Sequence, residues 1–248
     1  MDKNVIITGA NRGIGFAMVK KFAENGCNVW ACARKFNMEF EEQIGELAEQ
    51  NGVWIKPVYF DLLDEVEIKE GITGIFKEKK AIHTLINNAG IFHSKIFQMH
   101  TLNDIKQMFD INVIAPMYIA QLILKVMARQ KSGNIVNIAS LAGISPFFGA
   151  TCYGSTKAAI IHFTRTLAAE VSLLGNIRVN AIAPGHVDTD MTEHMKGENL
   201  QQVFRTSAIK RLASVNEIAD VGYFLTSDEA TFINGEVIRV DGGEIHGR

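Results

Sequence analysis

The chain has 248 residues, enough for one large α/β domain that buries a substantial core. Hydrophobic residues make up 47% and charged residues 21%, a composition typical of a globular protein in water. The formal net charge is −2, which excludes the strong positive field that attracts nucleic acid or an anionic membrane.

In the first third of the chain, short apolar runs alternate with stretches of helical periodicity. In chain order, these patterns predict a strand at 4–8, a helix at 13–25, a strand at 28–33, a helix at 39–50, a strand at 54–60, a helix at 64–79 and a strand at 83–87. Gly26 follows the first of these helices and is expected to end it, because glycine adopts the left-handed conformation of a C-cap without strain.

The alternation continues to the end of the chain. It predicts a helix at 102–130, a strand at 134–139, a helix at 151–174, a strand at 178–183, a helix at 216–226 and a strand at 236–240. Pro116 is expected to bend the long helix, since proline cannot donate a helical hydrogen bond. Residues 187–210 are polar and weakly periodic. Because long loops in compact domains are usually functional, we hypothesise that this segment is a lid over a substrate.

Repeated strand–helix–strand units predict a parallel sheet with helices on both faces, because parallel strands are joined by crossovers over the sheet. Right-handed crossovers give an α/β protein with a doubly wound parallel sheet, the Rossmann fold. No Pro/Ser-rich linker or repeat interrupts the pattern, so residues 1–248 are interpreted as one domain. Within it we expect a cofactor half at about 1–90 and a catalytic and substrate half at about 91–248.

A glycine-rich turn with the spacing Gly-x3-Gly-x-Gly lies between the first predicted strand and helix. Its glycines permit a tight turn, a close approach of backbone to a pyrophosphate and close packing of helix on strand. The free N–H groups of the helix N-terminus then face phosphate oxygens. Glycine also occurs in turns for purely steric reasons, but the strand–turn–helix context favours a dinucleotide site. The residues predicted to form it are Gly9, Asn11, Arg12, Gly13, Ile14 and Gly15.

The end of the second predicted strand indicates NADP(H). A site for NAD places a carboxylate there to bind the ribose 2′-OH, but this chain has Ala33 followed by Arg34, with Arg12 in the glycine turn. Two guanidinium groups suit a 2′-phosphate, each through a charge-assisted hydrogen bond of about 1.5–3 kcal/mol. The alternative is that both are solvated surface arginines.

Tyr153 and Lys157 lie four residues apart near the start of a predicted helix, which places them on one face. Lowering the pKa of a phenol from about 10 to about 7 takes roughly 4 kcal/mol of preferential stabilisation of the phenolate, which we expect Lys157 and a bound nicotinamide to supply together. Ser140 follows a predicted strand, at the sheet edge that also carries the glycine turn. We predict that Ser140 holds a substrate carbonyl oxygen while Tyr153 protonates it.

With these motifs the chain resembles the short-chain dehydrogenase/reductase family over almost its whole length. The resemblance rests on residues 8–15 (TGANRGIG), residues 87–90 (NNAG), Asn112, Ser140, Tyr153-x3-Lys157 and Pro184-Gly185. It implies that Asn112 holds a water that links Lys157 to solvent, and that Lys157 also binds the nicotinamide ribose.

The resemblance also implies further cofactor contacts along the chain. These are Asp61 and Leu62 at the adenine, Asn88, Ala89 and Gly90 on the adenine-ribose side, Pro184 and Gly185 beside the cofactor, and Val187 and Thr189 at the carboxamide of the nicotinamide. A structural role for Asn88, as an amide that satisfies backbone groups between strands, is compatible with this.

Within the family, residues 133–140, 178–185 and 235–243 look most like the 3-oxoacyl-[acyl-carrier-protein] reductases of fatty acid biosynthesis. The implied reaction is hydride transfer from NADPH to a 3-oxoacyl thioester, with acyl carrier protein as a candidate partner. Lys131 falls near one basic docking position of these reductases, whereas Leu174 occupies the second. Phe147 and Phe148 predict an apolar mouth that suits an acyl chain or another hydrophobic ketone.

Other functions stay open at this point. The same segments occur in family members that act on a sugar, a steroid or another small ketone or secondary alcohol. A non-catalytic dinucleotide-sensing regulator is possible on this fold, although such proteins typically lose the Tyr or Lys, and sugar-nucleotide epimerases are usually longer. The family usually forms tetramers through the helices at 102–130 and 151–174 and the C-terminal strand, so we expect a homotetramer.

The cysteines and histidines indicate no metal site. Cys27, Cys32 and Cys152 form no CxxC pair, and the seven histidines lack the spacings of zinc sites. His186 is the histidine that we expect nearest to a substrate. No long apolar segment precedes the first strand, and apolar runs such as 113–120 are too short to span a bilayer. We therefore expect a cytoplasmic protein without a membrane span and with reduced thiols.

Overall fold

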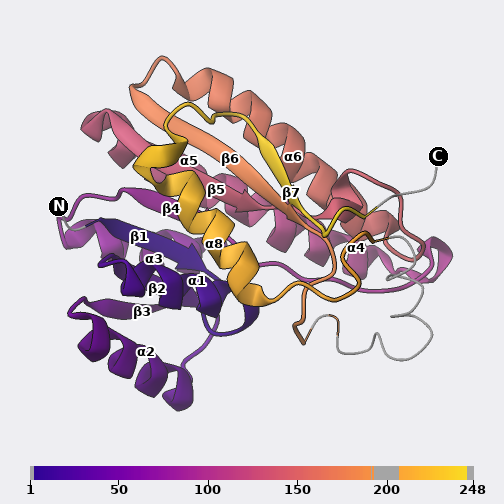
Figure 1. The fold of residues 1–248 in the computed structure, drawn as a ribbon, viewed down its shortest axis with the longest axis horizontal. Coiled ribbons are helices and arrows are strands. Elements are labelled where there is room, and N and C mark those ends of the chain that lie inside the picture. Colours follow the sequence, from indigo (N-terminus) through magenta and orange to yellow (C-terminus); the bar gives the residue numbers. More distant parts are fainter. Residues whose placement is uncertain (1–2, 191, 193–206, 245–248) are drawn as a thin grey trace.

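The computed structural model describes residues 3–190, 192 and 207–244, and it contains a seven-stranded parallel sheet. The strands lie in the order β3-β2-β1-β4-β5-β6-β7 (Figure 1). They are β1 (Asn4–Thr8), β2 (Asn28–Ala33), β3 (Ile55–Tyr59), β4 (Thr84–Asn87), β5 (Ser132–Ile138), β6 (Asn176–Pro184) and β7 (Val237–Val240). The order reverses between β1 and β4, which confirms the doubly wound Rossmann fold and places the ligand-binding crevice at the carboxyl ends of these strands.

Helices cover both faces of the sheet. They are α1 (Gly13–Glu24), α2 (Met38–Asn51), α3 (Glu65–Lys77), α4 (Leu102–Phe109), α5 (Ala115–Gln130), α6 (Thr151–Val171) and α8 (Val215–Thr226). The layer of α1, α2 and α8 packs on one face, and the layer of α3, α5 and α6 packs on the other. Figure 1 shows α8 lying across the front of the sheet. Because strands covered on both faces are buried throughout, β1 and β2 read as continuous apolar runs in the sequence.

The helix predicted at 102–130 is interrupted before its proline. The helix α4 ends at Phe109, a π-helical turn spans Asp110–Ile114, and α5 begins at Ala115. Pro116 lies in the first turn of α5, where backbone N–H groups make no hydrogen bond within the helix, so the proline costs no helical hydrogen bond. The wide turn therefore precedes Pro116, and it contains Asn112. Such π-turns are frequent at functional sites.

The same stretch corrects the expectation that no segment is long enough to span a bilayer. Leu102–Gln130 is 29 residues long and contains an 18-residue window with a mean hydropathy of 1.6, so by length and composition alone it could cross a membrane. The sequence argument counted only uninterrupted apolar runs. Half of this window is buried inside the fold, where α5 packs on α3 and β5, as in a core helix of a globular domain.

The proposed lid at 187–210 lies largely outside the described residues. Its described parts are 187–190, 192 and 207–210. There Val187 forms an isolated parallel bridge with Ala213, which attaches the start of the segment to the chain that precedes α8.

Candidate active site

Two adjoining cavities follow the carboxyl edge of the sheet. One, of about 460 Å³, lies over the ends of β1, β2 and β3. The other, of about 280 Å³, runs from the glycine turn to the start of α6. All the predicted cofactor-binding residues line one or both of them, namely Gly9, Asn11, Arg12, Gly13, Ile14, Gly15, Arg34, Asp61, Leu62, Asn88, Ala89, Gly90, Tyr153, Lys157, Pro184, Gly185, Val187 and Thr189.

The glycine turn fits a phosphate-bearing dinucleotide. A Cβ on Gly15 would lie 2.0 Å from the carbonyl oxygen of Gly9, so only glycine permits this contact between turn and helix. Gly13 has φ +54°, and a Cβ there would meet only Thr189, at 3.7 Å, so its surface is open to a ligand. Arg12, the N-cap of α1, makes no side-chain cap hydrogen bond, which leaves the first N–H groups of the helix for phosphate oxygens.

Asn88 has the structural role that the sequence left open. Its Nδ2 donates to the carbonyl oxygens of Thr8, at 2.9 Å, and Gly9, at 3.1 Å. In return the Thr8 Oγ1 accepts from the backbone N–H groups of Asn88 and Ala89. These bonds fix the end of β4 against the end of β1, at the switch point, while Asn88 also lines the second cavity.

Positively charged side chains line part of the 460 Å³ cavity, among them the two arginines that the sequence assigned to a 2′-phosphate. Arg12 and Arg34 both line it, together with Lys35, which the prediction missed although it is the next residue in the chain. Asp61 is the one carboxylate among the residues of this lining. The Arg12 guanidinium also pairs with Asp190, at 2.8 Å, in an exposed ion pair that a local sequence pattern cannot reveal.

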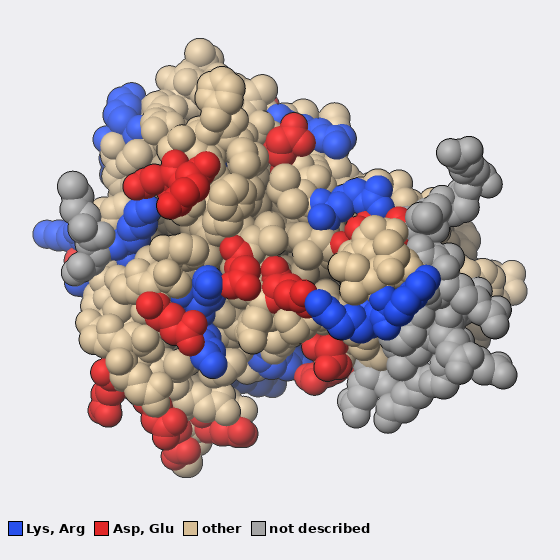
Figure 2. Space-filling view, in the orientation of Figure 1, with Lys and Arg blue, Asp and Glu red and all other residues tan. Residues whose placement is uncertain are grey.

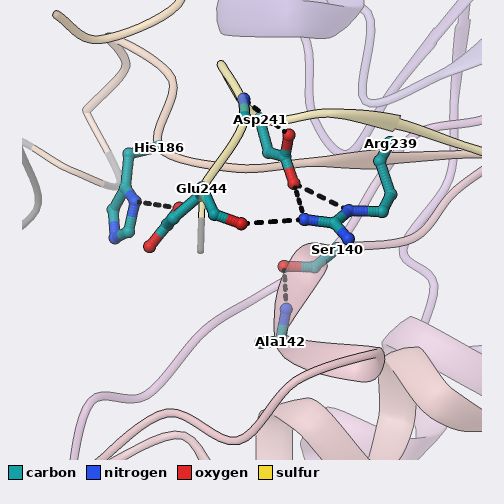
Figure 3. Close-up of polar contacts among 7 residues, drawn as sticks. Ser140, Ala142, His186, Arg239, Asp241 and Glu244 are labelled. Atoms are coloured by element: carbon teal, nitrogen blue, oxygen red, sulfur yellow. Dashed lines mark hydrogen bonds and ion pairs between the residues drawn. The ribbon is translucent and has the colours of Figure 1, made fainter. Parts of the chain in front are cut away.

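The structure brings Ser140, Tyr153 and Lys157 together in the wall of the second cavity. Lys157 is 4% exposed, its Nζ donates to the carbonyl oxygen of Ile138 at 2.7 Å, and it lies 5.6 Å from the centroid of the Tyr153 ring. Ser140 follows β5 and caps the short turn at Leu141–Gly143, where its Oγ accepts from the Ala142 N–H at 3.1 Å (Figure 3).

Asn112 lies close to the lysine. Its Oδ1 accepts from the Ile91 N–H at 2.8 Å, and its Nδ2 donates to the Ile91 carbonyl and to the Thr156 hydroxyl. A Cβ on Gly90 would lie 3.1 Å from the Asn112 Oδ1 and 3.5 Å from the Lys157 Nζ, so the two side chains converge on Gly90. The predicted water relay between them stays a prediction.

Burial shifts the two titratable groups of this site in unfavourable directions for ionisation. It raises the pKa of Tyr153 to about 12, although a hydrogen bond with the Ser140 hydroxyl lowers it in part. It lowers the pKa of Lys157 to about 8. The side chains alone therefore do not produce the acidic phenol expected from the sequence. That Lys157 and a bound nicotinamide together lower the pKa of Tyr153 stays a prediction.

A third cavity, of about 190 Å³, lies on the other side of Tyr153 and Ser140 and is the candidate substrate site. Its apolar lining includes Phe92, whose ring centroid lies 4.8 Å from that of Tyr153, and Phe147 and Phe148. Phe148 is 94% exposed at the mouth, in agreement with the apolar entrance expected from the sequence. Ser140 and Tyr153 line both this cavity and the cofactor cavity. A carbonyl bound at these two side chains would therefore lie where the substrate cavity meets the cofactor cavity.

Neither charge nor metal ligands point to a different kind of site in the described part of the chain. Figure 2 shows Lys and Arg interspersed with Asp and Glu on the face that carries α8. No group of three His, Cys, Asp or Glu among the described residues could hold a metal ion. The three cysteines are buried, and burial raises the pKa of each thiol.

Comparison with known proteins places these features in a family. The sequence profile described as short chain dehydrogenase matches residues 3–199. A 3-oxoacyl-[acyl-carrier-protein] reductase of Aquifex aeolicus is 36% identical over 96% of this chain and 95% of its own length. A 3alpha-hydroxysteroid dehydrogenase of Mediterraneibacter gnavus is 35% identical over 97% of this chain and 96% of its own. The crystal structure of a 3-oxoacyl-[acyl-carrier protein] reductase with bound NAD from Brucella melitensis has a TM-score of 0.87 and 30% identity, and covers 99% of this chain and 92% of the other.

Proposed function

The chain belongs to the short-chain dehydrogenase family, and on that basis we propose that it reduces the 3-oxo group of an acyl thioester with NADPH. The observation that carries the proposal is the position of Tyr153 and Ser140, which line both the cofactor cavity and the apolar substrate cavity. A bound nicotinamide dinucleotide supplies the hydride. The chain supplies the proton and the groups that orient the carbonyl.

Each polar side chain at the centre has a distinct task in this reaction. The Ser140 hydroxyl donates to the carbonyl oxygen and holds it next to Tyr153. Tyr153 protonates the same oxygen as negative charge develops on it. Lys157, anchored by the Ile138 carbonyl, stabilises the phenolate that remains. Asn112, fixed by the Ile91 backbone, holds a water through which Lys157 recovers a proton from solvent.

The choice of NADPH over NADH rests on Arg12, Arg34 and Lys35 around one end of the cofactor cavity. Three cations suit a 2′-phosphate, and the end of β2 offers no carboxylate to repel it. A solved neighbour holds NAD, so the test compares the two cofactors directly. Replacing Arg34 with alanine is expected to lower the NADPH-to-NADH ratio of kcat/KM about 10- to 100-fold, from the loss of about 1.5–3 kcal/mol. Lys69→Ala, an exposed cation on α3, is the matched control, and an unchanged ratio in Arg34→Ala would remove the assignment.

An acyl thioester is the first candidate substrate, because several relatives named 3-oxoacyl-[acyl-carrier-protein] reductase align with nearly the whole chain. Acyl carrier protein as the physiological carrier, and assembly as a homotetramer, are parts of the same proposal. An oxosteroid, which would be reduced to a hydroxysteroid, is the second candidate substrate. It is supported by the 35% identical steroid dehydrogenase and by the phenylalanines of the substrate cavity.

The test is NADPH oxidation, followed at 340 nm, with four substrates: an acetoacetyl thioester, a 3-oxosteroid, a 2-keto sugar and a small diketone. We expect the highest kcat/KM with the thioester. A higher value with the steroid would establish the second candidate, and turnover that survives Tyr153→Phe would refute the mechanism for both.

A further inference from the structure

Outside the proton-transfer centre, the described lining of the substrate cavity has three polar side chains, those of Ser94, Thr192 and His186. Of these only the imidazole of His186 can carry a charge. His186 follows β6, and its Nδ1 lies 3.2 Å from the Oε2 of Glu244, just beyond β7 (Figure 3). The Glu244 side chain is only 4% exposed and that of His186 17%. The sequence placed His186 near the substrate but gave no sign of Glu244, 58 residues away.

The surrounding contacts hold this pair in place. Arg239 on β7 donates both to the Asp241 carboxylate and to the backbone carbonyl of Glu244, which fixes the turn that carries the glutamate (Figure 3). A Cβ on Gly185 would lie 2.9 Å from the Cα of Asp241, so glycine at 185 allows the two turns to approach. The ring of Phe147 lies edge-on to the imidazole, with the centroids 6.0 Å apart.

This arrangement determines what the imidazole can do. A carboxylate only accepts hydrogen bonds, so Nδ1 must carry a hydrogen. Among the described residues, Nε2 has no hydrogen-bond partner. When the imidazole is protonated, it forms an ion pair with Glu244 and Nε2–H becomes a second donor. The other charged groups around His186 are paired among themselves, Arg239 with Asp241 and Arg211 with Glu217, and Tyr153 faces the same cavity.

We propose that His186 is a specificity-determining residue that donates a hydrogen bond to a second carbonyl oxygen of the substrate, and that Glu244 positions it. In the 3-oxoacyl thioester proposed above, this second oxygen is that of the thioester carbonyl. The proposal rests on the reductase activity proposed above and deepens it, because it names the residue that distinguishes such a thioester from a plain ketone.

The experiment compares two substrates that differ in the second carbonyl, the N-acetylcysteamine thioester of acetoacetate and 2-heptanone. His186→Leu is expected to raise KM for the thioester about 10- to 100-fold with little change in kcat, as expected for the loss of one charged hydrogen bond. Its kcat/KM for 2-heptanone is expected to change less than about 3-fold. His162→Leu, an exposed histidine on α6, serves as the matched control.

Two further variants separate a specific role from a structural one. The amide of His186→Gln can donate at every pH, so it is expected to recover part of the thioester activity. Glu244→Gln is expected to raise KM for the thioester, as His186→Leu does.

The outcomes distinguish this inference from the proposed function. A natural protein that reduces neither substrate would overturn the proposed function. Equal losses on both substrates in His186→Leu, with cofactor affinity unchanged by NADPH fluorescence titration, would overturn the role of His186 and leave the reductase activity standing.

Discussion

Replacing Lys157 with methionine is expected to stabilise the protein while it abolishes turnover. Burial lowers the pKa of this lysine from 10.5 to about 8. Each pKa unit corresponds to about 1.4 kcal/mol, so keeping the ammonium buried at pH 7 costs roughly 3 kcal/mol of folding free energy. Methionine has a similar length and no charge. It loses the hydrogen bond to the Ile138 carbonyl, worth about 1 kcal/mol, which leaves a net gain of about 2 kcal/mol.

The gain must depend on pH in one direction. In the unfolded chain the lysine is protonated up to its ordinary pKa, whereas in the folded protein it loses its proton at about pH 8. Between these values the unfolded state binds more protons, so the free energy of unfolding of the natural protein rises with pH. The advantage of Lys157→Met is therefore greatest at and below pH 7 and disappears near pH 10. The raised pKa of Tyr153 acts only above pH 10 and is common to both proteins.

Urea denaturation at pH 7 and at pH 10 measures the difference in free energy of unfolding between Lys157→Met and the natural protein. At pH 7 the expected gain corresponds to a rise in Tm of about 4–8 °C. Lys69→Met, an exposed lysine on α3, controls for the general effect of removing a positive charge. A variant that is less stable than the natural protein at pH 7, or a gain of equal size at both pH values, would refute the assignment of a buried ammonium to this site.

Two further variants test the catalytic and cofactor sites. Tyr153→Phe is expected to lower kcat about 100- to 10,000-fold, since it removes the proton donor, while NADPH affinity by fluorescence titration changes little; a kcat within 10-fold of the natural value would contradict the role. Gly15→Ala is expected to lose more than about 3 kcal/mol of stability or to fail to fold, because its Cβ would lie 2.0 Å from the Gly9 carbonyl oxygen. The matched Gly45→Ala, with nothing within 4 Å of the new Cβ, is expected to gain about 0.5–1 kcal/mol in thermal denaturation, and equal effects of the two substitutions would contradict the packing argument.

Features set by local pattern were predictable from the sequence. Burial on both faces makes the central strands uniformly apolar, so β1 and β2 stand out without any knowledge of their neighbours. The spacing of Tyr153 and Lys157 follows from helix geometry alone, and the structure places both in one cavity wall. Arg34 directly follows β2, so its position at the cofactor cavity could be inferred from the end of a strand.

Features set by contacts between distant residues were not predictable. The π-helical turn around Asn112 is accompanied by hydrogen bonds to the Ile91 backbone, 21 residues earlier, which the proline rule does not take into account. Likewise the Arg12–Asp190 ion pair joins the glycine turn to the chain after β6 across 178 residues. No periodicity or spacing encodes such pairs, because the strand order of the sheet decides which loops meet.

The burial of Tyr153 bears on which protonation state of the phenol is present at neutral pH. When the environment shifts the pKa values of two neighbouring groups, the shifts help to assign their roles as acid and base. A phenol whose pKa is raised to about 12 keeps its proton at neutral pH, and it is still far more acidic than the alcohol that reduction produces. It can therefore protonate a developing alkoxide. Oxidation of an alcohol needs the phenolate instead, and the same burial disfavours the phenolate. Lys157 stabilises the phenolate less as pH rises, because this lysine loses its proton at about pH 8. At neutral pH the chain's own residues therefore keep Tyr153 in the protonated form that reduction of a ketone requires.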